Sequence, residues 1–246
     1  MTEATKKSRA DTLLVERGLF ESRARAQAAI AAGLVVAGGK TVSKPSEMLA
    51  VDVEISAAPE HPWVSRGGVK LAGALERHPL EIEDHVCLDV GASTGGFTEV
   101  LLAEGAATVF AIDVGHGQLH PSLHGHARIV SMEETDIRDL AGKRLPARPD
   151  VVVIDVSFIS LKQVLPVALE LAGVPTQLLA LIKPQFEAPR GAAKKGIVRD
   201  AAVHRAVCDE IAALAATLGC RDIEVFPSSI AGGDGNLEFF LGARRG

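Results

Sequence analysis

Four short apolar runs, separated by stretches with helical patterns, constrain the fold of this 246-residue chain more than any other feature. The runs are residues 85–90, 107–113, 151–155 and 178–182. Each is as long as a strand and apolar at nearly every position, which is typical of parallel strands buried on both faces. Helices are expected near residues 96–104, 161–171 and 200–218. This alternation predicts an α/β fold, a doubly wound Rossmann-like domain whose ligands bind beyond the carboxyl ends of its strands.

A smaller basic unit precedes this domain. Helical patterns at residues 9–18 and 22–32 are followed by short strand patterns, the last of them at residues 51–55, which predicts a small α+β domain. Residues 1–44 contain eight Lys/Arg and four Asp/Glu, a net charge of +4, although the whole chain carries −5. We therefore expect three segments: an N-terminal domain over 1–56, a linker over 57–64, and a second domain over 65–246.

Composition excludes several classes of protein. No apolar run approaches the roughly 18 residues of a membrane span, and no signal peptide is recognisable, so we expect a cytoplasmic protein without a membrane partner. Cys87, Cys208 and Cys220 have neither disulfide nor zinc-site spacing, and no metal is predicted. With one Trp and no Tyr, a base-stacking surface is not expected, so any nucleic acid would be held through phosphates and shape.

A glycine-rich turn follows the first of the four apolar runs. It reads Asp-Val-Gly-Ala-Ser-Thr-Gly-Gly-Phe-Thr over residues 89–98, and Asp113 ends the next run, where it could accept hydrogen bonds from a ribose. In a dinucleotide fingerprint, Ser93 would stand where a glycine must admit a pyrophosphate. The misfit disfavours NAD and favours S-adenosylmethionine. Asp136 could meet the adenine amino group of that cofactor, or could simply cap a helix.

Charged residues end the two remaining runs. Asp155 and Lys183, of opposite sign, finish what we expect to be neighbouring strands on the ligand side. Lys70 precedes the first run, and Glu238 lies in an apolar segment near the end of the chain, where a carboxylate faces water or has a cationic partner.

Two basic segments suggest contact with anions. Arg23 and Arg25 fall in the first turn of an expected helix, where positive charge opposes the helix dipole, so either a bound phosphate or a solvated basic face would explain them. Residues 184–200 contain four Lys/Arg among small residues. This segment is either a solvated loop or, beside the expected active site, a lid or an RNA clamp.

These motifs together resemble a known family. The basic N-terminal unit resembles the S-four RNA-binding domain, and Lys70, Asp155, Lys183 and Glu238 resemble the Lys-Asp-Lys-Glu tetrad of FtsJ-type ribose methyltransferases. Their combination with Ser-Arg-Gly-Gly-Val-Lys-Leu (65–71), the turn at 89–98 and Lys-Pro-Gln-Phe-Glu (183–187) is similar to the TlyA family, some of whose members carry the name haemolysin.

The resemblance implies a class I methyltransferase that uses S-adenosylmethionine to methylate a cytidine ribose 2'-hydroxyl of ribosomal RNA, free or in assembled subunits. The expected catalytic residues are Lys70, Asp155, Lys183 and Glu238. The expected cofactor contacts are Asp89, Gly91, Ala92, Ser93, Gly95, Gly96, Phe97, Asp113, Asp136 and Asp155. The expected RNA contacts are Arg9, Arg17, Arg23, Arg25, Lys40, Arg66, Arg190, Lys194 and Lys195. The oligomeric state is not predicted.

The tetrad also suits this chemistry without the resemblance. A ribose hydroxyl becomes a good nucleophile when its proton is removed or its developing negative charge is stabilised. Burial and a second lysine nearby favour the neutral form of a lysine, so Lys183 could act as base or as stabilising cation, with Lys70 placing the hydroxyl. Three alternatives remain: an NAD-dependent oxidoreductase, a membrane-lysing protein, and an RNA-binding module without activity.

Overall fold

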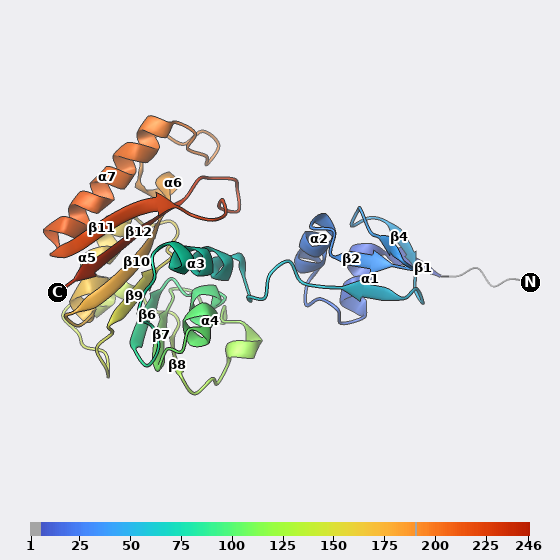
Figure 1. Ribbon diagram of the computed structural model, residues 1–246, viewed down its shortest axis with the longest axis horizontal. Coiled ribbons are helices and arrows are strands. Elements are labelled where there is room, and N and C mark those ends of the chain that lie inside the picture. Colours follow the sequence, from blue (N-terminus) through green and yellow to red (C-terminus); the bar gives the residue numbers. More distant parts are fainter. Residues whose placement is uncertain (1–5, 190) are drawn as a thin grey trace, which may run out of the picture. The chain divides into compact units, whose positions relative to one another are not determined.

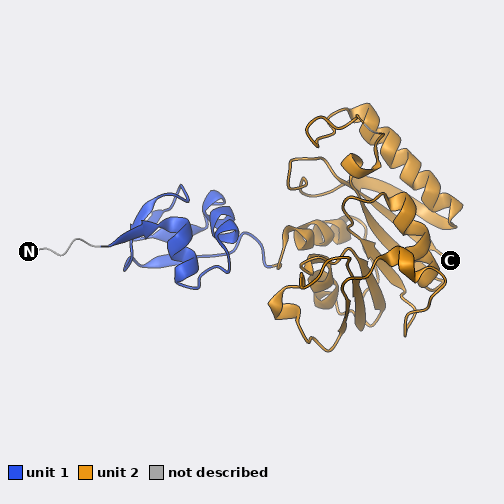
Figure 2. Ribbon diagram, turned by 180° about the vertical axis from the view of Figure 1, so that it is seen from behind, with its two compact units in different colours: residues 1–62 blue, residues 63–246 orange. Residues whose placement is uncertain are grey.

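The computed structural model describes residues 6–189 and 191–246, and the chain divides into two compact units, residues 1–62 and 63–246 (Figures 1 and 2). The division falls inside the predicted linker over 57–64.

The first unit combines two helices with two small antiparallel sheets. Its elements are β1 (Lys7–Arg9), α1 (Ala10–Glu16), α2 (Arg23–Ala31), β2 (Val35–Ala37), β3 (Lys40–Thr41), β4 (Met48–Ala50) and β5 (Ile55–Ala57). β1 pairs with β4, and the other sheet has the order β3-β2-β5. Ser22 caps α2 by accepting a hydrogen bond from the backbone N–H of Arg25. Leu14, Ile30 and Val35 lie in a single buried cluster, which holds helices and strands together.

The strand predicted over residues 51–55 is wrong. A turn separates β4 from β5 there, with the backbone N–H of Val53 donating to the carbonyl of Ala50. Val51, Val53 and Ile55 nevertheless pack, half-buried, against the core of the first unit. The alternating pattern therefore predicted the partial burial of these side chains correctly. It did not distinguish a strand from a turn that buries the same side chains. β5 also extends to Ala57, the first residue of the predicted linker.

The second unit has a seven-stranded sheet of order β11-β12-β10-β9-β6-β7-β8. Its strands are β6 (Val86–Val90), β7 (Thr108–Ile112), β8 (Ile129–Met132), β9 (Val151–Ile154), β10 (Thr176–Ile182), β11 (Cys220–Pro227) and β12 (Phe239–Arg245). Its helices are α3 (Arg66–Arg77), α4 (Gly96–Ala103), η1 (Pro121–Leu123), η2 (Ile137–Leu140), α5 (Leu161–Leu171), α6 (Pro184–Glu187) and α7 (Ala201–Thr217). β12 runs antiparallel to β10 and β11, and the five strands from β10 to β8 are parallel. The predicted doubly wound α/β fold is confirmed.

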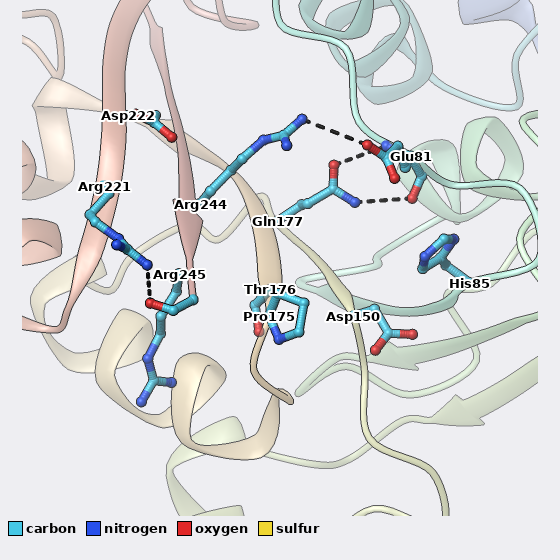
Figure 3. A pocket seen from close by; sticks show the side chains of 11 residues that line it. Glu81, His85, Asp150, Pro175, Thr176, Gln177, Arg221, Asp222, Arg244 and Arg245 are labelled. Atoms are coloured by element: carbon cyan, nitrogen blue, oxygen red, sulfur yellow. Dashed lines mark hydrogen bonds and ion pairs between the residues drawn. The ribbon is translucent and has the colours of Figure 1, made fainter.

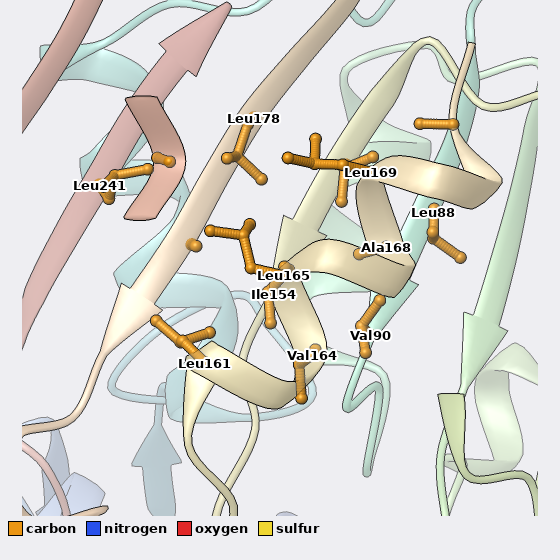
Figure 4. Packing of buried hydrophobic residues seen from close by; sticks show 14 of the residues in the cluster. Leu88, Val90, Ile154, Leu161, Val164, Leu165, Ala168, Leu169, Leu178 and Leu241 are labelled. Atoms are coloured by element: carbon orange, nitrogen blue, oxygen red, sulfur yellow. The ribbon is translucent and has the colours of Figure 1, made fainter. Parts of the chain in front are cut away.

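Two buried clusters cover the two faces of this sheet. On one face, Leu161, Leu165 and Leu169 of α5 pack against Ile154 and Leu178 of the strands (Figure 4). On the other face, α3 and α4 contribute residues such as Leu71 and Leu101. Because both faces are covered by tightly packed side chains, the strand ends are held rigidly, which suits a site that needs fixed geometry.

Candidate active site

The carboxyl ends of β6, β7, β9 and β10 meet at one edge of the sheet. Their register is continuous there, since Val90 pairs with both Ile112 and Ile154, and Ile154 pairs with Ala180. The segments that follow the four strands are therefore neighbours, as the parallel arrangement predicts.

A cavity of about 580 Å³ opens at this edge. Apolar side chains, among them Ile112, Ile137 and Val156, form part of its wall, and carboxylates stand at Asp113, Asp136 and Asp155. Apolar walls with a few convergent polar groups are typical of a small-molecule site of this size.

Asp113 links the ends of β6 and β7. Its Oδ2 accepts a hydrogen bond from the backbone N–H of Ser93 at 2.8 Å, and its Oδ1 accepts one from the N–H of Gly115 at 2.7 Å. Each carboxylate oxygen can accept more than one hydrogen bond, so both can still receive a ligand hydroxyl.

Close packing accounts for the glycines of the turn. Gly91 lines the cavity with φ +84°, and a Cβ there would contact the backbone oxygen of Asp155. Gly95 has φ +89°, and a Cβ there would meet the Leu123 side chain. A Cβ on Gly96 would touch the Ser65 hydroxyl oxygen and lie 2.8 Å from the Gly68 nitrogen, so Gly96 lets α3 and α4 approach closely.

Several predicted cofactor contacts lie outside the lining of the cavity. Within the described residues, that lining does not include Asp89, Ala92, Gly95, Gly96 or Phe97. Asp89 is fully buried and accepts a hydrogen bond of 2.6 Å from Thr98 Oγ1; burial raises its pKa to about 7, although the Thr98 hydrogen bond opposes the shift. Phe97 packs in the core, with its ring centroid 6.2 Å from that of Phe240.

Asp136 lines the cavity and caps a helix. Its side chain accepts a hydrogen bond from the backbone N–H of Arg138 at the start of η2 and forms an ion pair of 2.6 Å with the Arg138 guanidinium. The same guanidinium holds the pKa of Asp136 below its usual value. The capping interpretation is therefore correct, and the adenine contact stays a prediction.

The four tetrad residues form two ion pairs. Lys70 Nζ lies 2.6 Å from Glu238 Oε2, and Lys183 Nζ lies 2.5 Å from Asp155 Oδ1. The side chains of Lys70 and Lys183 are 10% and 11% exposed, and that of Glu238 is 3% exposed. Because Ile182 of β10 pairs with Phe239 of β12, Lys183 and Glu238 stand at neighbouring strand ends. Two buried cations thus each have a carboxylate partner, which meets the main requirement for burying charge.

The predicted RNA contacts of the first unit include residues with partners inside the protein. Asp11 is fully buried, and it accepts hydrogen bonds from Arg9, Arg23 and Gln27, with Arg23 Nη2 at 2.7 Å. The Arg9 hydrogen bond is the largest of the effects that, against burial, hold the pKa of Asp11 well below its usual range. Neither of the interpretations of Arg23 offered above, bound phosphate or solvated face, included this internal carboxylate, which lies 12 residues earlier in the chain. Arg17 donates to the backbone carbonyls of Val51 and Val53.

The remaining predicted RNA contacts lie on several elements. Lys40 is exposed on β3, and Arg66 Nη2 donates to the carbonyl of Ala231 at 2.7 Å. Lys194 forms an antiparallel bridge with Ile197, and Lys195 lies in the turn between them. Arg190 lies outside the described residues.

Two residues beside the tetrad escaped prediction from the sequence. Ser157 Oγ accepts a hydrogen bond from Lys183 Nζ at 2.9 Å, and Phe158 is 92% exposed with φ +64°. Both line the cavity. Neither residue carries a sequence signal of its own beyond its position directly after the strand that ends at Asp155.

A second cavity, of about 450 Å³, lies beside the amino ends of β9, β10 and β11 and the carboxyl end of β12 (Figure 3). Two of its arginines have these partners within the protein: Arg244 lies 3.9 Å from Glu81, and Arg221 donates to the carbonyl of Gly246. Gln177 exchanges hydrogen bonds with the backbone of Glu81.

The described part of the chain has neither a cluster of metal-ligating side chains nor a helix that could span a membrane. No group of three or more His, Cys, Asp or Glu side chains is placed to hold a metal ion. No described helix has both the length and the apolar character that crossing a membrane requires.

Each of the two units matches the profile of a known protein family. The profile of the FtsJ-like methyltransferases matches residues 63–245, and that of the S4 domain matches residues 8–55. The 16S/23S rRNA (cytidine-2'-O)-methyltransferase TlyA of Mycobacterium tuberculosis is 41% identical over 97% of this chain and 90% of its own length. Hemolysin A of Brachyspira hyodysenteriae is 36% identical over 94% of this chain and 97% of its own.

A solved structure from Streptococcus thermophilus, described as a hemolysin, superimposes with a TM-score of 0.74 at 40% identity, covering 98% of this chain and 90% of that one. These matches confirm the methyltransferase class and the cofactor, S-adenosylmethionine, predicted from the sequence. The chain belongs to the TlyA family of FtsJ-like methyltransferases.

Proposed function

We propose that this protein transfers a methyl group from S-adenosylmethionine to the 2'-hydroxyl of a cytidine in ribosomal RNA. The observation that carries the proposal is the pair of buried lysine–carboxylate contacts, Lys70–Glu238 and Lys183–Asp155, at the edge of the sheet where the cavity opens. The activity in the name of the Mycobacterium tuberculosis relative supports it, since that relative matches almost the whole chain.

The cavity suits the cofactor. Its volume falls in the range of small-molecule sites, and Asp113 offers carboxylate oxygens where a ribose diol would need acceptors. Asp136 stands on the same wall and would receive the adenine amino group, while Gly91 and Ser93 offer backbone that a ligand can approach closely. Bound there, S-adenosylmethionine supplies an electrophilic methyl group on a sulfonium.

The protein's part of the reaction is to prepare the ribose hydroxyl. Lys183, beside the cavity, takes the proton of the 2'-hydroxyl or stabilises the negative charge that develops on its oxygen. Lys70 holds the hydroxyl in place, and the two carboxylates orient the lysines and limit their mutual repulsion. Asp155, Lys183 and Glu238 stand at strand ends, and Lys70 lies on α3, which packs against the sheet. The hydroxyl would therefore be positioned before reaction, which lowers the entropic part of the barrier.

Basic side chains on both units would hold the RNA. Those proposed to contact phosphate are Arg9, Arg17, Arg23, Arg25, Lys40, Arg66, Lys194 and Lys195. The S4 domain match supports RNA binding by the first unit. Arg9 and Arg23 can serve both purposes, since their side chains are 45% and 55% exposed while they bind Asp11. We expect the substrate to be free ribosomal RNA or an assembled subunit, and the enzyme to act in the cytoplasm.

The decisive experiment supplies methyl-labelled S-adenosylmethionine and purified ribosomal subunits from cells that lack the enzyme. We expect label to enter RNA, and mapping to place it on the 2'-oxygen of a cytidine. Label on a base, or none in any RNA while the protein binds S-adenosylmethionine, would contradict the proposal. Tight NADH binding without S-adenosylmethionine binding would instead favour an oxidoreductase.

A further inference from the structure

Lys183 has a second partner besides its carboxylate. Its Nζ lies 2.5 Å from Asp155 Oδ1 and donates a hydrogen bond of 2.9 Å to Ser157 Oγ. Both partners come from the segment directly after β9, two residues apart, and both line the cavity. The lysine is therefore held from two directions at the cavity wall.

The segment that carries Ser157 is fastened to the segment that carries Lys183. Phe158 packs on Phe186, with ring centroids 5.0 Å apart. Glu187, which is 8% exposed, accepts hydrogen bonds from the Ser160 hydroxyl and, at 2.7 Å, from the backbone N–H of Leu161. These contacts follow Ser157 in the chain, and the Asp155–Lys183 ion pair precedes it, so the Ser157 hydroxyl is kept within reach of the amine.

The protonation state of the Lys183 nitrogen determines how many hydrogen bonds it can donate. A neutral amine has two N–H donors and one lone pair, and an ammonium has three donors. The Ser157 oxygen takes one N–H in a hydrogen bond, whereas Asp155 Oδ1 attracts the nitrogen as an ion pair without hydrogen-bond geometry. Because that one hydrogen bond is directional and the ion pair is not, Ser157 sets the rotation about the Cε–Nζ bond, and a remaining position on the nitrogen, the lone pair of the amine or another N–H of the ammonium, is left for the substrate.

We propose that Ser157 is a positioning residue, which fixes the rotation of the Lys183 amine so that this remaining position points at the ribose hydroxyl. The inference rests on the proposed function, since it concerns the same lysine and the same reaction. Without the Ser157 oxygen, Asp155 alone holds the amine, which can rotate about the Cε–Nζ bond and spends less time in the productive orientation.

The test compares four variants in single-turnover methyl transfer to ribosomal subunits. Ser157→Ala is expected to lower the rate constant about 10-fold at saturating cofactor and subunit, less than removal of the lysine itself, because orientation is only part of its contribution. The affinities for subunit and for S-adenosylhomocysteine should stay within about 3-fold. Ser157→Thr keeps a hydroxyl and should restore the rate constant to within about 3-fold of the wild type. Ser131→Ala, an exposed serine on β8, is the matched control, and Lys183→Ala gives the lower limit.

A second measurement needs no RNA. Nuclear magnetic resonance of protein labelled with ¹⁵N-lysine, with the Lys183 signal assigned by its loss in Lys183→Arg, reports the exchange of the Nζ protons with water. We expect faster exchange in Ser157→Ala and wild-type exchange in Ser157→Thr.

The outcomes separate the two proposals. If the wild type does not methylate ribose, the proposed function fails, and the exchange measurement still judges whether Ser157 holds the amine. If the wild type is active and Lys183→Ala is not, a Ser157→Ala rate constant within twofold of the wild type overturns the role of Ser157. A Ser157→Thr variant as impaired as Ser157→Ala overturns it too, because the hydroxyl would then not be the group that matters.

Discussion

The carboxylate of Asp113 accepts a hydrogen bond of 2.8 Å from the backbone N–H of Ser93, and this contact joins the second strand end of the doubly wound sheet to the glycine-rich turn of the first. The residue expected to bind the cofactor ribose therefore also holds the turn that the cofactor must approach. A change at Asp113 should affect both features together.

Replacement of Asp113 by Ala should weaken binding of S-adenosylhomocysteine by about 10- to 100-fold, since hydrogen bonds to a charged group contribute about 1.5 to 3 kcal/mol. Isothermal titration calorimetry measures this directly. The control is Asp139→Ala, which removes an exposed carboxylate from η2 and should leave binding unchanged. Equal affinities for the wild type and Asp113→Ala would remove Asp113 from the cofactor site.

Lys183→Ala should reduce methyl transfer by at least about 100-fold, the lower limit for a positioned acid–base group, while cofactor affinity stays within a few-fold. Lys183→Arg should fail as well, because a guanidinium does not give up a proton near neutral pH and has a different shape. Single-turnover methylation with saturating cofactor and subunit measures both. Folded Lys183→Ala protein with a near-wild-type rate would refute the mechanism.

Arg23 and Arg25, two residues apart on α2, should behave differently. Arg23→Ala removes one donor to the buried Asp11 carboxylate and leaves Arg9, Thr12 and Gln27, and it should destabilise the first unit by about 1 to 2 kcal/mol. Arg25→Ala leaves all of these donors in place. Amide hydrogen exchange over α1 and α2 should accelerate in Arg23→Ala and stay near the wild type in Arg25→Ala.

Binding to RNA gives the complementary measurement on the same two variants. Each substitution should reduce the dependence of affinity on salt concentration if its side chain contacts a phosphate. An unchanged salt dependence in Arg25→Ala would mean that this arginine has no part in RNA binding.

Asp89 should make stability depend on pH around neutrality. Its pKa is raised by burial to about 7, above the unfolded value of about 3.9, so the folded state holds the proton more tightly. Stability is therefore highest below about pH 4 for this group and is lost as pH rises through about 7, by up to about 4 kcal/mol for a shift of this size. Asp89→Asn has no proton to lose and can still accept the Thr98 hydrogen bond.

Guanidinium denaturation at pH 5.5 and pH 8.0 tests this expectation. The loss of unfolding free energy between the two pH values should be larger in the wild type than in Asp89→Asn. The same loss in both proteins would show that Asp89 ionises normally.

The sequence predicted where some residues of the site lie, whereas the contacts between them are seen only in the structure. Strand-end positions could be predicted, because the apolar runs show where each strand stops, and Asp155 and Lys183 follow directly. The pairing within the tetrad could not, since which lysine meets which carboxylate depends on how β10 and β12 align and where α3 packs. Ser157 was missed for the same reason: a serine after a strand looks the same in sequence whether or not a lysine lies 2.9 Å away.

The sequence by itself determined the α/β class of the second unit and the edge of the sheet where ligands are expected. Strands that are buried on both faces are apolar at nearly every position, so they can be recognised as continuous apolar runs. Its motifs also indicated the family and the cofactor. Tertiary structure alone decided the assignments that depend on contacts between distant segments. It gave Arg23 a carboxylate on α1 as its partner and placed a turn between β4 and β5, where a strand was predicted. It also placed Gly95 and Gly96 in packing contacts rather than on the cavity wall. Periodicity records which residues are buried, whereas hydrogen bonds and ion pairs depend on which segments meet in space.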